Sequence, residues 1–193
     1  MMIDEKRNLA APCGLYCGAC MIYRINKLGD SELLDGMKEQ FIQMFSGIEN
    51  MQQIPGMPPP AKGFDFSRMQ REVKEGRMNL CCEGCLSDLV ASHCQNCGFR
   101  ECAQEKGLAS CSQCPDMPCQ WLVDFNNDVM PHHGDVLISL ERQKEIGIDA
   151  WLAEQEERWR CLQCESPLSW YDAECPDCKA TQTHTFGSSP FPA

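Results

Sequence analysis

The cysteines between residues 81 and 119 are the residues of this chain whose type and spacing point most directly to chemistry. Nine of them fall within 39 residues. Thiolates bind soft and borderline metal ions, and two cysteines separated by two residues place both sulfur atoms on one side of a tight turn. The segment therefore predicts metal–thiolate chemistry. Its cysteines are Cys81, Cys82, Cys85, Cys94, Cys97, Cys102, Cys111, Cys114 and Cys119.

A short internal repeat organises this block, because Cys94-x2-Cys97-x4-Cys102 recurs seventeen residues later as Cys111-x2-Cys114-x4-Cys119. Two partitions into metal sites fit the repeat. In the sequential partition the sets are Cys82, Cys85, Cys94 and Cys97, then Cys102, Cys111, Cys114 and Cys119. In the interleaved partition each CxxC pair takes a cysteine from the other repeat, as in proteins with two iron–sulfur clusters. Both partitions stay open, and sets of four thiolates suit either Zn²⁺ or an iron–sulfur cluster.

A second motif lies near the N-terminus, where Cys13, Cys17 and Cys20 follow the spacing C-x3-C-x2-C. The same spacing resembles the one with which radical S-adenosylmethionine enzymes hold a [4Fe–4S] cluster with one open iron. Those enzymes place it on a barrel of alternating strands and helices, a pattern that this sequence lacks. The other interpretation is a structural site completed from elsewhere in the chain. If Cys81 completes this trio, the sixteen cysteines divide into four sets of four.

The C-terminal cysteines form the most specific pattern. Cys161-x2-Cys164 is followed, after ten intervening residues, by Cys175-x2-Cys178. This spacing is typical of a zinc ribbon, in which two tight turns bind one ion and a short β-hairpin links them. A segment this small has too little apolar surface to fold alone, so bound Zn²⁺ is expected to supply its folding free energy.

Helices are predicted around these motifs from hydrophobic periodicity and capping residues. The expected helical ranges are 20–28, 31–46, 67–76, 100–106, 120–126, 134–146 and 148–159. A Pro/Gly-rich connector is expected at 50–66, and the pair His132–His133, next to Pro131, is expected in an exposed loop. The predicted fold class is mainly α: a small cysteine-rich, metal-bound helical domain with knuckle loops, plus a C-terminal β-hairpin zinc ribbon.

The same patterns divide the chain into segments. We expect a cysteine-rich metal-binding core at residues 1–128, a helical connector at 129–159, the zinc ribbon at 160–180 and a disordered tail at 181–193. The tail is assigned to disorder because it is short, polar and terminal.

Composition limits the classes of partner and the compartment. The net charge is −11, with 28 acidic and 17 basic residues, so we expect no binding to nucleic acid. No run of about 18 apolar residues occurs, which predicts no membrane span. The first residues lack the apolar stretch of a secretory signal, which predicts a cytoplasmic protein. Thiols stay reduced there, so metal sites are favoured over a disulfide framework. Nothing in the sequence indicates an oligomeric state.

The combined motifs resemble the family known as "domain of unknown function 3795". The residues that carry the resemblance are APCGLYCGAC (11–20), CEGCL (82–86), CQNCGFRECAQEKGLASCSQCPDMPC (94–119) and the following QWL. The resemblance covers roughly residues 9–128, and residues 147–178 look like the helix and ribbon that some members carry. By matching positions, the family's cysteines fall on Cys13, Cys17, Cys20, Cys82, Cys85, Cys94, Cys97, Cys102, Cys111, Cys114 and Cys119. Cys81 stands where the family usually has another residue, and the family implies no particular reaction.

No recognisable catalytic set accompanies the cysteines. The sequence has no G-x-S-x-G, phosphate loop, dinucleotide fingerprint or H-E-x-x-H motif, so we assign no enzyme activity from it. We predict a metal-binding protein, with Zn²⁺ in the ribbon and in the core block, that presents a surface to a protein partner. The alternative is an iron–sulfur protein with a [4Fe–4S] cluster in the core and redox or enzymatic activity at Cys13, Cys17 and Cys20.

Overall fold

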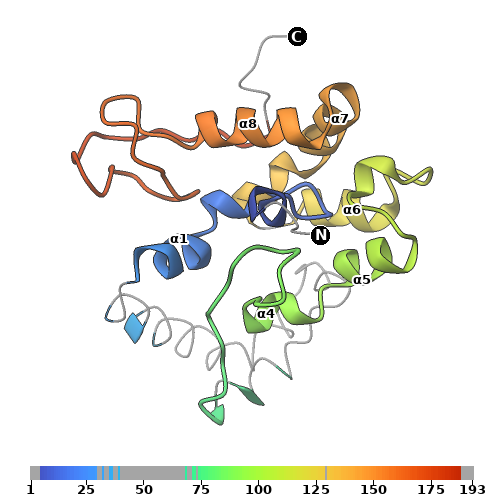
Figure 1. Ribbon diagram of the computed structural model, residues 1–193, viewed down its shortest axis with the longest axis horizontal. Coiled ribbons are helices and arrows are strands. Elements are labelled where there is room, and N and C mark those ends of the chain that lie inside the picture. Colours follow the sequence, from blue (N-terminus) through green and yellow to red (C-terminus); the bar gives the residue numbers. More distant parts are fainter. Residues whose placement is uncertain are drawn as a thin grey trace.

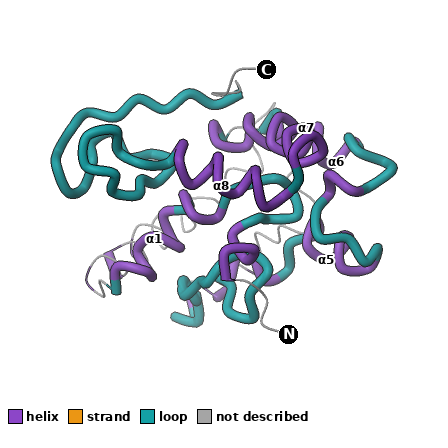
Figure 2. Tube along the Cα trace, turned by 45° about the horizontal axis from the view of Figure 1, so that its top comes forward, coloured by secondary structure: helices purple, strands orange, loops and turns teal. Residues whose placement is uncertain are grey.

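The computed structural model of this chain describes residues 5–29, 32, 35, 36, 39, 68, 71, 72, 74–128 and 130–187. Within this part, helices are joined by long loops and no strand forms (Figure 2), which confirms a mainly α fold. The α-helices are α1 (Met21–Leu28), α4 (Ser92–Gln95), α5 (Gly98–Glu105), α6 (Gln120–Asn126), α7 (Val136–Ile146) and α8 (Ile148–Arg158). The 3-10 helices are η1 (Glu5–Leu9), η2 (Cys17–Ala19), η4 (Cys111–Gln113) and η5 (Pro131–Asp135).

Helix positions follow the sequence pattern closely wherever the structure describes them. The predicted ranges 20–28, 120–126 and 148–159 correspond to α1, α6 and α8. Helix α1 ends at Gly29, whose backbone is left-handed, and α7 begins after the turn η5. The helix expected at 31–46 lies largely, and the connector at 50–66 wholly, outside the described residues. Of the helix expected at 67–76, residues 68, 71, 72 and 74 are helical and residues 75 and 76 form a turn.

The central hydrophobic cluster joins the N-terminal segment to α5, α6 and α7. Its buried residues are Ala11, Cys13, Cys85, Phe99, Leu122, Val136 and Leu140. Gly14 shows how closely α7 approaches: a Cβ at this position would lie 2.9 Å from Leu140 Cγ and from the Val136 carbonyl oxygen. Gly14 also has φ +94°, which strains any other residue. The packing therefore joins α7 to the same hydrophobic cluster as the N-terminal motif.

A second cluster attaches α8 to the N-terminal segment. Trp151 is fully buried, and its ring meets Tyr16 edge to face with centroids 6.3 Å apart. Arg142 of α7 pairs with Glu154 of α8 through two hydrogen bonds of 2.6 and 3.0 Å. Because the pair is bidentate and half-buried, it fixes the angle between the two helices more firmly than a surface pair would.

The C-terminal cysteine segment extends from the end of α8 as a loop and lies beside α1 (Figure 1). It is held there by Trp170 N–H, which donates to the Ala19 carbonyl at 3.0 Å, and by Arg24, which donates to the Pro167 carbonyl at 3.1 Å. His132 of η5 stacks on the Trp170 ring at a centroid distance of 4.0 Å. The segment is therefore packed against the core and is not joined to it by the chain alone.

The structure differs from two sequence expectations around this segment. His132 is 7% exposed rather than in an exposed loop, because Trp170 and Tyr171 cover it. The first residues of the expected disordered tail are packed: His184 and Phe186 lie against Trp159, at centroid distances of 4.9 and 6.0 Å. Tail prediction from composition failed here because an aromatic residue in a polar stretch finds an apolar surface to cover.

No helix in the described part of the chain has the length and the apolar content needed to cross a membrane.

Candidate metal centre

The four C-terminal thiols meet at one point. The sulfur atoms of Cys161, Cys164, Cys175 and Cys178 all lie within 4.8 Å of one another. Cys161 Sγ is 3.6 Å from Cys178 Sγ, and Cys164 Sγ is 3.5 Å from Cys175 Sγ. A tetrahedral ion with metal–sulfur bonds of about 2.3 Å separates its sulfur ligands by roughly 3.8 Å. A disulfide requires about 2.05 Å. The geometry therefore fits one tetrahedral ion and no disulfide.

Two turns of the same design present these thiols. The Cys161 N–H donates to the Ser166 carbonyl, and its carbonyl accepts from Glu165 N–H, both at 2.8 Å. The second turn repeats this pattern from Cys175, with the Ala180 carbonyl at 2.8 Å and Lys179 N–H at 3.0 Å. Each turn thus places a CxxC pair on its inner side, as the spacing predicted.

The fourth residue after each first cysteine has a left-handed backbone. Glu165 has φ 61° and Lys179 has φ 62°. This conformation is unfavourable for residues with a Cβ, so it persists only where the surroundings enforce it. The two turns have this strained conformation at equivalent positions. The backbone of each turn therefore adopts an unfavourable conformation that places its two sulfur atoms side by side. This conformation was not predictable from residue type, since neither residue is glycine or asparagine.

Strands did not form where a β-hairpin was predicted. The structure shows only isolated antiparallel bridges, Arg160 with Pro167 and Glu174 with Thr181, one across each turn. The Arg160–Pro167 bridge is made by the hydrogen bonds from Cys161 N–H to the Ser166 carbonyl and from Leu168 N–H to the Trp159 carbonyl, and no further pair continues it. The residues between the turns are used to dock the segment on the core.

Polar groups around the quartet favour thiolates at two positions. Hydrogen bonds from the Ser166 side chain and backbone lower the pKa of Cys164 to about 6. Backbone N–H groups of Gln163 and Cys164 lower the pKa of Cys161, and Gln182 Nε2 lies 3.5 Å from its sulfur. Sequence reasoning missed Gln182, because nothing in its neighbourhood marks it as a partner of a cysteine twenty-one residues earlier.

Cys178 behaves differently. The Ala180 N–H favours its thiolate, but partial desolvation and hydrogen bonds with the other three thiols outweigh this and raise its pKa to about 12. Without an ion the quartet therefore retains protons, which a bound cation displaces. Cys161 and Cys175 are buried with Leu168 in a small cluster, while Cys164 and Cys178 face solvent. The ion would sit at the surface of the segment with all four positions filled by protein.

The core cysteines are close to one another but more widely spread. In the described part of the chain, which includes all sixteen cysteines, the C-terminal quartet is the one group whose ligand atoms lie within 4.8 Å of one another. The sets predicted at Cys82, Cys85, Cys94 and Cys97, and at Cys102, Cys111, Cys114 and Cys119, therefore stay predictions, as does the trio with Cys81.

The N-terminal motif lies against the central hydrophobic cluster. Cys13 is buried in the central cluster with Leu140, and its neighbouring thiols are Cys97, Cys85 and Cys111; burial raises its pKa well above the ordinary value. Cys17 instead donates a hydrogen bond to Cys85, which raises the pKa of Cys17 and lowers that of Cys85. Cys13 and Cys17 thus share Cys85 as a neighbouring thiol.

Three core cysteines occupy the position just before a helix: Cys20 before α1, Cys97 before α5 and Cys119 before α6. Burial raises the pKa of Cys20, whereas the backbone N–H groups of Ile22 and Tyr23 favour its thiolate. Cys97 has the same relation to Phe99 and Arg100. Unpaired N–H groups of a helix start stabilise negative charge, so these positions suit thiolate ligands. The sequence indicates these positions by a cysteine at the N-cap of each helix, where Ser, Thr, Asn or Asp is usual.

A second concentration of thiols lies between α5 and α6. Burial raises the pKa of Cys111 to about 12, and the thiols of Cys119, Cys102, Cys114 and Cys97 add to the effect in that order. Lys106 Nζ lies 3.3 Å from Cys114 Sγ and 2.8 Å from Asp116 Oδ2. A lysine at this distance supplies positive charge to a thiolate at the edge of the group.

A surface pocket of about 320 Å³ borders the N-terminal motif. It is lined by parts of η1, α1 and α8, and among its residues are Gly18, which separates Cys17 from Cys20, and Glu83, which separates Cys82 from Cys85. Basic and acidic side chains alternate around it, so the pocket itself indicates no particular ligand.

Fold and site together define a helical, cysteine-rich protein with a four-thiol group built for a metal ion. Residues 9–124, more than half of the chain, match the family described as proteins of unknown function (DUF3795). The chain belongs to this family. The match ends before the C-terminal quartet. No curated protein and no solved structure matches the chain.

Proposed function

We propose that this protein binds one Zn²⁺ ion between Cys161, Cys164, Cys175 and Cys178, and that residues 160–180 form a zinc ribbon. The observation that carries the proposal is the meeting of four sulfur atoms at the spacing of a tetrahedral ion. Four thiolates with no open position are typical of structural zinc. Hard cations such as Mg²⁺ and Ca²⁺ require oxygen ligands instead.

The bound ion would fix the ribbon on the core. Leu168 packs only against Cys161, Cys175 and Ala180 in the ribbon's own cluster, which is too small to fold the segment. The ion therefore links the two turns. Trp170 then attaches this segment to the core, through its hydrogen bond to Ala19 and its stacking on His132. In this proposal the zinc ion stabilises the folded ribbon and takes no part in a reaction.

We further propose that this surface binds a protein partner. Leu162 stands at the tip of the first turn with 98% of its area exposed. Leu162 lies outside the hydrophobic core and is exposed for contact with a partner. The net charge of −11 argues against nucleic acid as that partner. A cytoplasmic location is in keeping with sixteen free cysteines.

The test compares three forms of the purified chain. Zinc per chain is measured for the native sequence, Cys175→Ser and Leu162→Ser. We expect Cys175→Ser to lose one zinc and Leu162→Ser to lose none. Proteins captured from cell extract are then quantified for each form. A partner retained equally by Leu162→Ser refutes the docking surface, while unchanged zinc in Cys175→Ser refutes the ribbon site.

The domain division stays part of the proposal, with a core at 1–128, a connector at 129–159 and the ribbon. An iron–sulfur protein is the second candidate function. The observation that favours it is the concentration of thiols in the central cluster, where Cys13 and Cys85 are buried and Cys17, Cys97, Cys111 and Cys119 pack against them. This second candidate involves the core cysteines, none of which is a ligand of the proposed ribbon zinc.

A further inference from the structure

Two ribbon thiols are more exposed than every other cysteine of the chain. All sixteen cysteines are among the described residues, and Cys164 and Cys178 are exposed, whereas the other fourteen are buried or half-buried. Oxidation of a cysteine requires a thiolate that the oxidant can reach. In the proposed zinc site every ligand is a thiolate. Cys164 and Cys178 therefore meet both conditions.

Each exposed thiol contacts a buried thiol of the other turn. Cys164 Sγ lies 3.5 Å from Cys175 Sγ, and Cys178 Sγ lies 3.6 Å from Cys161 Sγ. The residues Cys161 and Cys175 are 1% and 0% exposed. The two contacts use each of the four thiols once. An oxidant therefore reaches one member of each pair, while the other member is held beside it and away from solvent.

The two turns are also in contact through an apolar side chain. Leu168 is 1% exposed and forms one buried cluster with Cys161 and Cys175, one cysteine from each turn. Gln182, which follows the second turn, has its Nε2 3.5 Å from Cys161 Sγ in the first turn. These contacts are too few to fold the ribbon, but they do not depend on the ion. A thiol that loses the ion therefore still faces its partner in the other turn.

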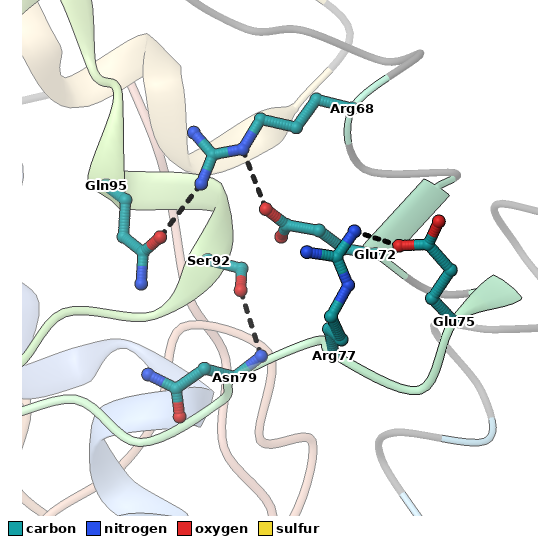
Figure 3. Close-up of polar contacts among 7 residues, drawn as sticks. All are labelled: Arg68, Glu72, Glu75, Arg77, Asn79, Ser92 and Gln95. Atoms are coloured by element: carbon teal, nitrogen blue, oxygen red, sulfur yellow. Dashed lines mark hydrogen bonds and ion pairs between the residues drawn. The ribbon is translucent and has the colours of Figure 1, made fainter.

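The core thiols lie in segments that are joined to one another. Cys81 is half-buried, and its N–H donates to Asn79 Oδ1 at 2.9 Å. Asn79 N–H donates to Ser92 Oγ at 2.9 Å (Figure 3), which joins this loop to α4 and to Cys94 within it. Cys94 is likewise half-buried. Cys81 is therefore a suitable control thiol, because it has a cysteine neighbour in the sequence but is less exposed than Cys164.

We propose that Cys164 and Cys178 are sites of oxidation by hydrogen peroxide, and that oxidation replaces the ribbon zinc with disulfides from Cys164 to Cys175 and from Cys178 to Cys161. The inference rests on the proposed zinc site and adds a modification that regulates it. Each disulfide forms between two sulfur atoms that are already in contact. Hydrogen peroxide is small and neutral, so the net charge of −11 does not repel it.

Each disulfide forms in two steps. The Cys164 thiolate attacks one oxygen of the peroxide, the O–O bond breaks, and the products are a sulfenic acid and hydroxide. The Cys175 thiolate then attacks the sulfenic sulfur, the S–O bond breaks, and a second hydroxide leaves as the disulfide forms. Cys178 and Cys161 react in the same way. In total, two peroxides are reduced, four thiolates are oxidised, and four protons from solvent convert the four hydroxides to water as Zn²⁺ departs.

The disulfides link the same two turns as the ion. Closing each pair requires the sulfur atoms to approach from 3.5 and 3.6 Å to about 2.05 Å, a movement that rotation of two cysteine side chains supplies. A disulfide within one CxxC pair would leave the two turns unlinked. Bonds across the turns therefore give an oxidised ribbon that has lost its ion and stays packed on the core.

The experiment treats the zinc-loaded full chain with hydrogen peroxide. Released zinc is measured with a chromogenic chelator, and disulfides are mapped by mass spectrometry after cleavage at Glu165 and Glu174, which places the two CxxC pairs on separate peptides. We expect the loss of one zinc per chain and a joined pair of peptides, in which fragmentation assigns Cys164 to Cys175. Cys81→Ser is the control, and it should release the same zinc and give the same joined peptides.

Two further measurements test the steps separately. In Cys175→Ser the sulfenic acid on Cys164 has no partner, so we expect it to persist and to be labelled by dimedone. The oxidised native chain is also compared with a reduced chain from which a chelator has removed zinc. We expect trypsin to cleave at Arg160 and Lys179 more slowly in the oxidised chain, because the disulfides keep the two turns linked.

The outcomes separate this inference from the proposed function. Equal zinc in the native chain and Cys175→Ser before oxidation refutes the zinc site and with it this inference. Zinc release with a disulfide inside each CxxC pair, or with sulfinic acids and no disulfide, overturns the inference and leaves the zinc site standing. Slower zinc release in Cys81→Ser than in the native chain also overturns it, because the oxidant would then act through the core.

Discussion

Replacing His132 with glutamine is expected to remove a pH dependence of stability that the native chain shows between pH 7 and pH 5. The ring is 7% exposed, stacks on Trp170 and has Nδ1 2.5 Å from Tyr171 Oη. Burial, followed by the neighbouring His133, lowers the pKa of His132 from 6.5 to about 3. At pH 5 the ring is neutral in the folded protein and charged in the unfolded chain.

The sign and size follow from proton linkage. The unfolded state binds more protons than the folded state below about pH 6.5, so the free energy of unfolding falls as the pH is lowered. One pKa unit corresponds to about 1.4 kcal/mol, and pH 5 is about 1.5 units below the unfolded pKa, so His132 contributes a loss of about 2 kcal/mol. Burial also lowers the pKa of His133, against the opposing effect of Asp128, and His133 is present in both proteins.

The assay is urea unfolding of the native chain and His132→Gln at pH 7, 6 and 5. The variant is expected to be less stable at pH 7, and the difference between the two proteins should shrink by about 2 kcal/mol at pH 5. Protonation of thiols and loss of metal occur in both proteins and cancel in the comparison. A difference that stays constant with pH refutes the reasoning, because His132 would then titrate alike in the folded and unfolded states.

Three further predictions concern packing, strain and metal. Leu140→Ala should lower the free energy of unfolding by about 2–5 kcal/mol, since Leu140 is fully buried against Gly14; a loss below about 1 kcal/mol in chemical unfolding contradicts this. Lys179→Gly should raise the melting temperature, because it relieves about 1 kcal/mol of left-handed strain; an unchanged or lower value contradicts it. Chelation of zinc should expose Arg160 and Lys179 to trypsin before α7 is cleaved, and simultaneous cleavage contradicts the ribbon account.

The helices were largely predictable from the sequence. Apolar positions at helical spacing located α1, α6 and α8, and tertiary packing did not alter them. The ribbon quartet was also predictable, because its ligands come from two local turns whose spacing alone brings each CxxC pair together. Both features are encoded over short stretches of chain.

The contacts between the N-terminal motif and the cysteine block were not predictable, because they join residues far apart in the sequence. Cys17 meets Cys85 across sixty-eight positions of sequence, and Asn8 and Asn26 hold the two segments together. The sequential partition, in which Cys97 joins Cys82 and Cys85, stays a prediction, and Cys97 packs against the cluster that contains Cys85. The burial of His132 had the same cause, since Trp170 and Tyr171 reach it from the ribbon.

The zinc content of the purified chain tests the central claim most directly. Zinc is measured per chain in the native protein and in Cys175→Ser, whose side chain is fully buried within the quartet. Four thiolates around one ion predict a decrease of one zinc per chain, with the helical circular dichroism of the core retained. An equal zinc content in the two proteins would contradict a metal site between Cys161, Cys164, Cys175 and Cys178.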